Sequence, residues 1–344
     1  MGEFDLIHRF FTRPTPRAVL GVGDDCALLQ SAPGMQMAIS TDMLVSGRHF
    51  FADTAPQRLG HKCLAVNLSD LAACGARPLA FTLALALPEA DEAWLAPFAK
   101  GLLQLADAHG CELIGGDTTR GPLNICITVL GEVPASGATP MLPTSALLRS
   151  GAQAGDDMYV SGTLGDAALA LRALQGTLAL PSPLLEAARA RLEQPTPRVA
   201  LGMALRGVAS ACADVSDGLL GDLGHILERS GLGAQIEIEP SLPLLAARAD
   251  LAGGAALFDA QFGRDTALQC VLAGGDDYEL VFCAAPAMRD AVAQAALQSA
   301  TPVTRIGSMR AERGLALLDS QGQSVSPASL QLASFDHFAA SSSP

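Results

Sequence analysis

The sequence has very little lysine: among its 344 residues only Lys62 and Lys100 carry this side chain. Neither lies in a GxxxxGK[ST] phosphate-binding loop or in the VAIK strand motif of protein kinases. Asp and Glu number 35 against 22 Lys and Arg, so the formal net charge is −13. Nucleic acids and anionic membranes are bound by clustered basic side chains, and we expect neither as a partner. Any phosphate chemistry must therefore rely on metal ions, arginine and backbone N–H groups.

The chain also lacks a long hydrophobic run, a secretion signal and paired cysteines. The segment PLAFTLALALP near 78–88 is shorter than the roughly 18 apolar residues of a membrane helix, and we expect a buried strand there. The N-terminal sequence MGEFDLIHRFF has no basic region followed by an apolar core, which favours a cytoplasmic location. The eight cysteines form no CxxC pair, which favours buried, reduced thiols, Cys26 included, over disulfides or a zinc site.

The length predicts two domains of roughly 130 to 200 residues each. The Pro-rich stretch PASGATPMLPTSA marks the boundary, so we expect an N-terminal domain over 1–134, a linker over 135–148, a C-terminal domain over 149–338 and a disordered tail over 339–344. Apolar periodicity predicts strands and helices without strict βα alternation, which favours an α+β fold. The expected strands are 35–41, 81–87, 111–115, 123–133, 157–162, 212–216, 234–239, 278–283 and 302–307, and the expected helices are 61–76, 91–110, 164–175, 197–210 and 217–231.

Acidic residues recur at the expected strand ends, beside glycine or other small residues. They lie in GVGDDCALL, ISTDML, NLSDLAA, IGGDTTR, DVSDGLL and AGGDDYEL: Asp24, Asp25, Asp42, Asp70, Asp117, Asp214, Asp217, Asp276 and Asp277. Each one alone is explained by capping of the following helix or turn. If several converge, two carboxylates about 4 Å apart repel by about 4 kcal/mol at an effective dielectric constant of 20, so the group needs cations. Magnesium, held by a few carboxylates together with substrate phosphates, suits this pattern better than a calcium EF-hand, whose acid spacing is missing.

Seven motifs resemble, in chain order, those of thiamine-monophosphate kinases: ISTDMLVSGRHF, AVNLSDLAACGARP, LIGGDTTRG, LLRSGAQAGD, DVSDGLLGDLGHI, GGDDYEL and SFDHF. The resemblance covers nearly the whole chain. It implies ATP- and Mg²⁺-dependent phosphorylation of thiamine monophosphate to thiamine diphosphate. It also implies the two-domain α+β fold shared with aminoimidazole ribonucleotide synthetase and selenophosphate synthetase, in which the N-terminal domain pairs in a homodimer and the C-terminal domain closes over the nucleotide.

The resemblance further implies roles for individual residues. The implied metal ligands are Asp25, Ser40, Thr41, Asp42, Asp70, Asp117, Asp214 and Asp217; the implied ATP contacts are Gly116, Asp117, Arg149 and Ser216; and the implied thiamine phosphate contacts are His49, Asp276 and Phe335. Asp42 and Asp117 are expected to be the most critical, and no side chain is expected to form a covalent intermediate. Related sequences commonly have Glu at the position of Asp276, so this shorter acid is expected to reach the substrate through water.

Purely structural roles remain open for some of these side chains. His49 fits a half-buried histidine, Arg149 a surface arginine and Phe335 a core aromatic. Two other functions also remain open: a related synthetase acting on another acceptor, such as formylglycinamidine ribonucleotide, and a non-catalytic protein that binds divalent cations or nucleotides. The chemistry favours direct in-line transfer, because a phosphate monoester is mostly a dianion at neutral pH and needs no general base.

Overall fold

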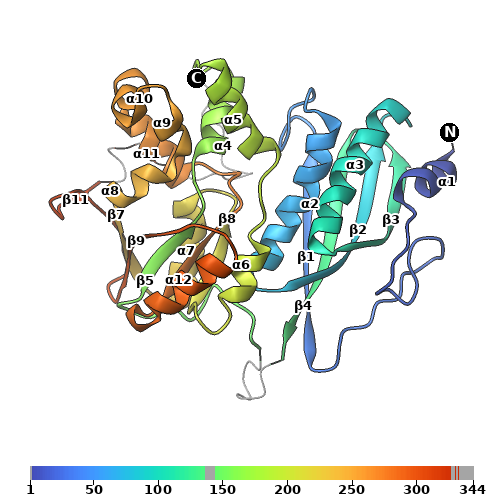
Figure 1. Cartoon of the computed structure of the whole chain (residues 1–344), viewed down its shortest axis with the longest axis horizontal. Coiled ribbons are helices and arrows are strands. Elements are labelled where there is room, and N and C mark those ends of the chain that lie inside the picture. The colour runs from blue at the N-terminus through green and yellow to red at the C-terminus, as the bar shows by residue number, and fades with distance from the viewer. Residues whose placement is uncertain (1, 136–143, 327–329, 331, 333–344) are drawn as a thin grey trace. The chain divides into compact units, whose positions relative to one another are not determined.

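The computed structural model describes residues 2–135, 144–326, 330 and 332 (Figure 1). Most of the expected linker, the expected tail and Phe335 lie outside the described residues. The chain divides into an N-terminal unit, Met1–Ala146 with Glu193–Arg206, and a C-terminal unit, Leu147–Leu192 with Gly207–Pro344. Residues 193–206 therefore join the N-terminal unit, although they lie within the range expected for the C-terminal domain.

The N-terminal unit has a four-stranded sheet in the order β1-β4-β2-β3. Strands β1 and β4 are antiparallel, as are β4 and β2, whereas β2 and β3 run parallel. Its elements are α1 (Glu3–Leu6), the π-helical turn η1 (Ile7–Phe11), β1 (Met35–Val45), α2 (Pro56–Ala73), β2 (Arg77–Leu87), α3 (Glu92–His109), β3 (Glu112–Arg120), β4 (Asn124–Pro134) and α6 (Val199–Ala204). Figure 1 shows α2 and α3 side by side on one face of this sheet.

Glycines let the helices of this unit touch through their backbones. A Cβ on Gly60 of α2 would lie 2.1 Å from the carbonyl oxygen of Phe98, and one on Gly101 of α3 would lie 1.9 Å from that of Gln57. Helix α6 approaches α2 in the same way, because a Cβ on Gly202 would lie 2.0 Å from the carbonyl oxygen of Ala72. Such close packing explains why residues 193–206 belong to the N-terminal unit.

The C-terminal unit has a seven-stranded sheet in the order β11-β10-β7-β9-β5-β8-β6. Only β10 and β7 pair in parallel, and the other neighbours are antiparallel. Its strands are β5 (Asp157–Ser161), β6 (Ala211–Val215), β7 (Gly233–Glu237), β8 (Glu279–Ala284), β9 (Val303–Arg310), β10 (Gly314–Leu318) and β11 (Ser324–Val325). Its helical elements are α4 (Asp166–Leu174), α5 (Ser182–Glu193), α7 (Leu219–Ser230), α8 (Ile238–Ser241), η2 (Leu242–Leu244), α9 (Ala246–Asp250), α10 (Gly254–Phe262), α11 (Arg264–Ala273), η3 (Pro286–Met288) and α12 (Arg289–Gln298).

A large apolar core supports this second sheet, with Val160, Val215, Leu223, Ile236 and Val281 among its fully buried side chains. The α+β class expected from the sequence is confirmed in both units. No helix in the described part of the chain is long and apolar enough to cross a membrane.

The expectation that Cys26 is buried is wrong. Cys26 is exposed, whereas Cys63, Cys111, Cys212, Cys270 and Cys283 are buried; all eight cysteines are free. Cys26 lies in the segment before β1 that forms no helix or long strand, and the neighbouring Leu28 is 52% exposed. An apolar run alone therefore did not indicate burial here.

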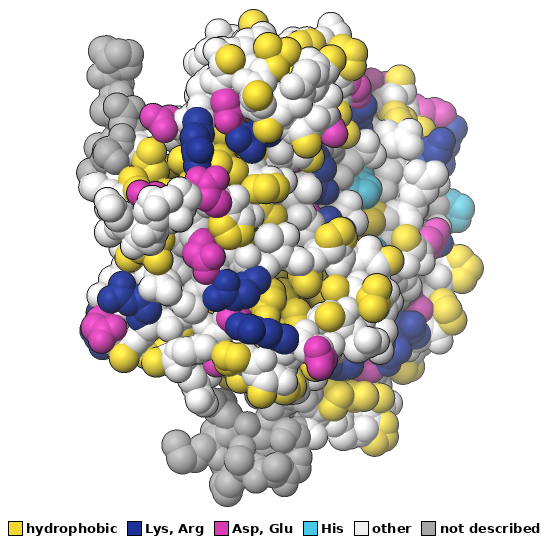
Figure 2. All heavy atoms as spheres, turned by 60° about the vertical axis from the view of Figure 1, so that its left-hand side comes forward, with side chains coloured by type: hydrophobic (Ala, Val, Ile, Leu, Met, Phe, Trp, Pro, Cys, Tyr) yellow, Lys and Arg dark blue, Asp and Glu magenta, His cyan; other side chains and the backbone are white. Residues whose placement is uncertain are grey.

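Charges of both signs lie close together on one face of the molecule. On the face shown in Figure 2, Lys and Arg side chains stand in small groups among acidic, apolar and uncharged ones.

In the C-terminal unit, Arg289 and Arg305 both pair with the buried Asp157, at 2.7 and 2.6 Å. Their hydrogen bonds lower the pKa of Asp157 to about 2, although burial opposes this shift.

Candidate active site

The first group of predicted site residues lies between β1 and α2. Ser40 Oγ donates a hydrogen bond to Asp70 Oδ2 at 2.5 Å, and the backbone N–H of Asp42 donates to Asn67 Oδ1 at 3.1 Å. Asn67 is fully buried and donates in turn to the carbonyl oxygen of Cys63. Because Ser40 and Asp42 are two positions apart on a strand, both side chains point to the face that carries α2. The structure thus brings Ser40, Asp42 and Asp70 together.

Thr41 points to the opposite face of the sheet, since side chains alternate along a strand. Its hydroxyl lies 2.8 Å from the hydroxyl of Thr128 on β4. The same face of β1 exposes Ile39, Met43 and Val45, with exposed fractions of 64%, 54% and 36%. A side-chain role for Thr41 therefore belongs to a different surface from that of Ser40 and Asp42.

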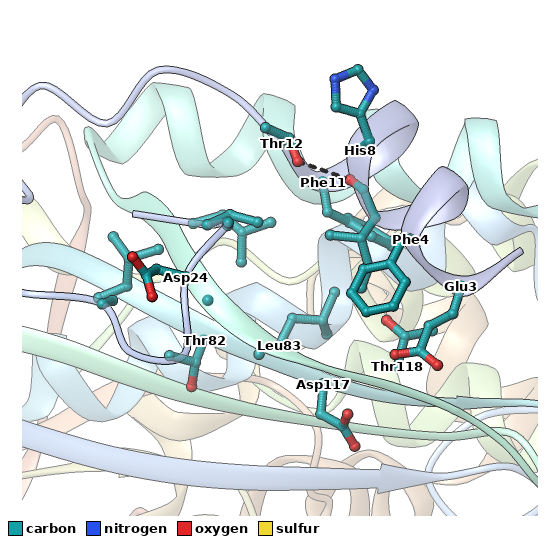
Figure 3. A pocket seen from close by; sticks show the side chains of 18 of the residues that line it. Glu3, Phe4, His8, Phe11, Thr12, Asp24, Thr82, Leu83, Asp117 and Thr118 are labelled. Atoms are coloured by element: carbon teal, nitrogen blue, oxygen red, sulfur yellow. Dashed lines mark hydrogen bonds between the residues drawn. The ribbon is translucent and has the colours of Figure 1, made fainter. Parts of the chain in front are cut away.

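A cavity of about 820 Å³ lies at β3, the edge strand of the N-terminal sheet (Figure 3). The predicted residues Asp25, Gly116 and Asp117 all line it, together with Asp24. Figure 3 shows Asp117 and Thr82 pointing the same way from neighbouring strands. The GDD motif before β1 and the GGD motif in β3 are therefore brought to one place by the fold.

Gly116 occupies a position that excludes other residues. Its φ of 148° is in a region that residues with a side chain rarely adopt, and a Cβ would lie 1.9 Å from the carbonyl oxygen of Leu83. The backbone of β3 can approach β2 closely only because this residue is glycine. Asp117 follows directly and is exposed at the cavity.

An apolar wall of this cavity comes from the N-terminal segment and was missed by sequence reasoning. Phe4, Ile7 and Phe11 line the cavity, and Phe4 is 81% exposed. The only available signal was the apolar pattern in GEFDLIHRFF, which reads equally well as an ordinary amphipathic turn.

Three arginines attach the N-terminal segment to the rest of the unit. Arg9 pairs with Glu92, and Arg13 pairs with Asp107 at 2.6 Å. Arg17 donates to the carbonyl oxygens of Gly110, at 3.0 Å, and Pro78, at 3.3 Å. These contacts place the segment along α3 and beside β3, where its apolar side chains reach the cavity.

His49 is half-buried in the turn that follows β1. The backbone N–H of Val45 donates to His49 Nδ1 at 3.0 Å, and Lys62 Nζ donates to the carbonyl oxygen of His49 at 3.3 Å. A neutral ring that accepts at Nδ1 carries its proton on Nε2. The turn therefore orients the imidazole with Nε2 as its donor.

The C-terminal unit joins two acidic motifs through their backbones. The N–H of Asp276 donates to the carbonyl oxygen of Ser216, and the N–H of Tyr278 donates to that of Val215, both at 2.8 Å. A Cβ on Gly275 would lie 2.5 Å from the carbonyl oxygen of Ser216. The turn that carries Asp276 thus lies directly against the DVSD segment, and its glycine makes that approach possible.

Asp222, to which the sequence assigned no role, shapes the DVSD segment. Its Oδ2 accepts hydrogen bonds from the backbone N–H groups of Ser216, at 2.9 Å, and Asp217, at 3.0 Å. Burial raises the pKa of Asp222 to about 7, although these N–H groups and the charge of Arg149 act in the other direction. Arg149 itself is exposed, and its carbonyl oxygen accepts from Ser230 Oγ at 3.3 Å. Ser216, Asp217 and Arg149 therefore belong to one region of the C-terminal unit.

The predicted ligands suit a hard cation in their chemistry. All offer oxygen, from carboxylates or hydroxyls, which is what Mg²⁺ prefers. For the carboxylates of Asp25, Asp117 and Asp217, the described residues provide no lysine or arginine partner. Among the residues that the structure describes, no three His, Cys, Asp or Glu side chains form a ready-made metal site. This arrangement fits Mg²⁺ that is completed by substrate phosphates and water better than an all-protein cage.

The fold and these acid-lined strand ends agree with one class of proteins. Residues 23–133 match the family of AIR synthase related proteins in their N-terminal domain, and residues 153–320 match the C-terminal domain of the same family. The chain is thus a two-domain AIR synthase related protein.

Comparison with individual proteins narrows this class. The chain is 43% identical to thiamine-monophosphate kinase of Salmonella typhimurium, over 98% of both chains. It is similar to the crystal structure of thiamine-monophosphate kinase from Stenotrophomonas maltophilia K279a, with 46% identity, a TM-score of 0.79 and coverage of 94% of this chain and 96% of that one. It also resembles AaThiL complexed with AMPPCP and TMP, with 26% identity, a TM-score of 0.72 and coverage of 90% and 89%. The chain belongs to the thiamine-monophosphate kinase family.

Proposed function

We propose that this enzyme transfers the γ-phosphoryl group of ATP to thiamine monophosphate, forming thiamine diphosphate and ADP, in the cytoplasm. The observation that carries the proposal is the 43% identity to a thiamine-monophosphate kinase over 98% of both chains. The related AaThiL, which binds AMPPCP and TMP, supports the same pair of substrates.

The acceptor requires little from the protein in the way of proton transfer. A phosphate monoester has a second pKa near 6, so thiamine monophosphate is mostly a dianion at neutral pH and attacks without a general base. The main obstacle is the repulsion between two polyanions, which the site must offset by charge and orientation. We therefore propose direct in-line transfer without a phosphorylated side chain.

Mg²⁺ is the proposed source of that charge, since the chain has only two lysines. The residues proposed to hold it are Asp25, Ser40, Asp42, Asp70, Asp117, Asp214 and Asp217. Thr41, whose side chain lies on the opposite face of the sheet, could take part only through its backbone carbonyl oxygen. Bound Mg²⁺ would neutralise phosphate charge as the transition state develops. For Asp117 and Asp217, the described residues provide no arginine or lysine partner that Mg²⁺ would have to displace.

The nucleotide is proposed to use the cavity at β3, where Gly116 and Asp117 would contact it. Arg149 and Ser216 of the C-terminal unit are proposed as separate ATP contacts. The volume of about 820 Å³ is within the usual range for small-molecule sites. Its apolar wall of Phe4, Ile7 and Phe11 suits a flat ring, while Asp24, Asp25 and Asp117 provide the acidic side.

His49, Asp276 and Phe335 are proposed to contact thiamine monophosphate. His49 supports this role, because the bond from Val45 N–H to Nδ1 fixes the orientation of the ring just after β1. Tyr278 Oη donates to Asp276 Oδ1 at 3.3 Å and helps to orient that carboxylate.

A homodimer is proposed on the open face of the N-terminal sheet. Ile39, Met43 and Val45 expose an apolar stripe along β1, and such stripes mark interaction surfaces when they are contiguous. Light scattering should give the mass of two chains for the wild type and of one chain for the double variant Ile39→Asp, Met43→Asp.

Product analysis tests the proposed reaction. The purified chain is incubated with ATP and Mg²⁺ and, in separate reactions, with thiamine monophosphate, free thiamine or formylglycinamidine ribonucleotide. We expect thiamine diphosphate from the monophosphate alone, with an equal amount of ADP. ADP formed only with the ribonucleotide would instead assign the chain to the synthetase branch of the fold.

A further inference from the structure

The turn before β8 holds side-chain-bearing residues in an unusual backbone conformation. Asp276 and Tyr278 have φ values of 66° and 52°, in the left-handed region. Ala300 is the one other non-glycine residue with positive φ in the described part of the chain. Such conformations persist where the surroundings hold them, and they concentrate at functional sites. Contacts with the surrounding residues must therefore hold this turn in its conformation.

One side of the turn is held by the DVSD segment, through the N–H groups of Asp276 and Tyr278. The other side is held by Asp277, which lies between the two strained residues and is 0% exposed. Asp277 Oδ2 accepts a hydrogen bond from the N–H of Gly165 at 2.8 Å. Its Oδ1 is buried and has no hydrogen-bond partner among the described residues. A buried carboxyl group with one satisfied oxygen is costly unless it has a specific task.

A second buried acid, Glu279 at the start of β8, stabilises the region next to this turn. Glu279 accepts hydrogen bonds from Ser161 Oγ at 2.6 Å and from Arg191 Nη2 at 2.7 Å. Gly162 has no room for a side chain, since a Cβ would lie 2.2 Å from Glu279 Oε1. The start of β8 is thus fixed by Glu279, and the turn just before it depends on Asp277.

We propose that Asp277 is a positioning residue for recognition of the phosphate acceptor: its bond to Gly165 N–H holds the strained turn, so that Asp276 presents its carboxylate in one orientation. This inference rests on the proposed function, because it assumes that Asp276 contacts thiamine monophosphate. Loss of the anchor lets the turn relax and moves Asp276, while the opposite side of the turn stays bonded to Val215 and Ser216.

The test is steady-state kinetics on the full chain and two variants of Asp277. Burial raises the pKa of Asp277 well above its usual range, so Asn has nearly the shape and charge of the native group and keeps an acceptor for Gly165 N–H. Asp277→Ala should raise the KM for thiamine monophosphate about tenfold or more and change the KM for ATP less than about twofold. Asp277→Asn should restore the acceptor KM to within about twofold of wild type.

Asp166 supplies the matched control. It is also a buried aspartate in this unit, and it accepts hydrogen bonds from the N–H groups of Ala246, at 3.2 Å, and Ala247, at 2.9 Å, which start α9. Asp166→Ala should lower the melting temperature and leave the KM for thiamine monophosphate unchanged. If Asp277→Ala behaves like Asp166→Ala, with lost stability and no change in acceptor KM, the positioning role is overturned.

Tyr278→Phe keeps the proposal testable if Asp277→Ala does not fold. This variant removes only the hydroxyl that donates to Asp276 Oδ1. It should raise the acceptor KM about threefold at an unchanged melting temperature. An unchanged acceptor KM would count against a fixed orientation of Asp276. A wild-type chain that forms no thiamine diphosphate would overturn the proposed function itself, a result that needs no variant.

Discussion

The acids at the β3 cavity and the acids behind the β8 turn share one residue type but have opposite surroundings. In the N-terminal unit, Asp25 and Asp117 are exposed at a cavity, without a described arginine or lysine partner. In the C-terminal unit, Asp166, Asp277 and Glu279 are at most 2% exposed and bond to backbone N–H groups, a hydroxyl or an arginine. A carboxylate that already has hydrogen-bond partners must lose them to bind a cation. An exposed carboxylate only has to give up bound water. The comparison separates the exposed acids Asp25 and Asp117, which are proposed to bind ligands, from buried acids that stabilise the fold.

Asp117→Asn should give the largest effect. It keeps the size of the side chain but removes the charge proposed to hold Mg²⁺, so kcat/KM should fall by about 100-fold or more. The melting temperature should stay within about 2 °C of wild type, because Asp117 is exposed and bonds to no described cation. Glu312→Gln, which affects an exposed acid near Arg310 in the C-terminal unit, is the control and should leave activity unchanged. Full activity in Asp117→Asn would remove Asp117 from the ligand-binding group.

Glu279→Ala tests the buried acids of the C-terminal unit. It removes the carboxylate that accepts from the largely buried Arg191 and the buried Ser161, and loss of one member of a buried ion pair costs about 3 to 5 kcal/mol. Urea unfolding should show this loss of stability. Glu92→Ala, which breaks the exposed pair with Arg9, should cost less than about 1 kcal/mol. Equal losses in the two variants would show that the burial of Glu279 does not decide its contribution.

The pH dependence of stability should have opposite signs for two buried aspartates. Burial raises the pKa of Asp277 above its unfolded value, so the wild type loses stability as pH rises past about 4 and the unfolded chain ionises first. Asp277→Asn cannot ionise, and its stability relative to wild type should increase between pH 4 and 7, by up to about 1.4 kcal/mol per pH unit. A constant difference over this range would contradict burial of a neutral Asp277.

Asp157 should show the opposite pH dependence of stability, and the smallest change in stability of the variants considered. Arg289 and Arg305 lower its pKa to about 2, so its stabilising contribution is present above about pH 4 and is lost as pH falls toward 2. Asp157→Asn should therefore be less stable than wild type at pH 6, by about 1 to 2 kcal/mol after screening at the partly exposed arginines, and nearly equal to it at pH 2. Thermal unfolding at both pH values checks this, and a gap that persists at pH 2 would count against the ion pairs.

Much of the fold was predictable because its main elements have strong periodicity and clear end signals. The expected helix 91–110 is α3, Glu92–His109, where Asp91 caps the start by accepting from the N–H of Ala93 and Gly110 ends the helix with φ of 57°. The expected strand 234–239 was too long, because β7 ends at Glu237 and the chain continues as α8. Helices α10, α11 and α12 were missed, since they are short and rich in alanine, so that no apolar stripe repeats often enough to be recognised.

The site was predictable as a set of motifs, but not as an arrangement in space. The sequence treated Ser40, Thr41 and Asp42 as one group, whereas strand alternation sends Thr41 to the opposite face. It gave Asp277 and Asp222 no role. Asp277 is buried against Gly165, which is distant in the sequence, and Asp222 bonds to the DVSD backbone, a contact that a linear motif does not show. The apolar wall from Phe4 to Phe11 depends equally on where three arginines attach the N-terminal segment.

A crystal structure with Mn²⁺ in place of Mg²⁺, AMPPCP and thiamine monophosphate would test the division between the two kinds of acid most directly. The anomalous signal of Mn²⁺ should lie about 2.1 Å from carboxylate oxygens of the proposed ligands, with Asp117 among them. No signal should lie beside Asp277 or Glu279, whose oxygens are buried. Mn²⁺ bound at Asp277 and Glu279, with none at Asp117 in a crystal that retains both substrates, would contradict the account.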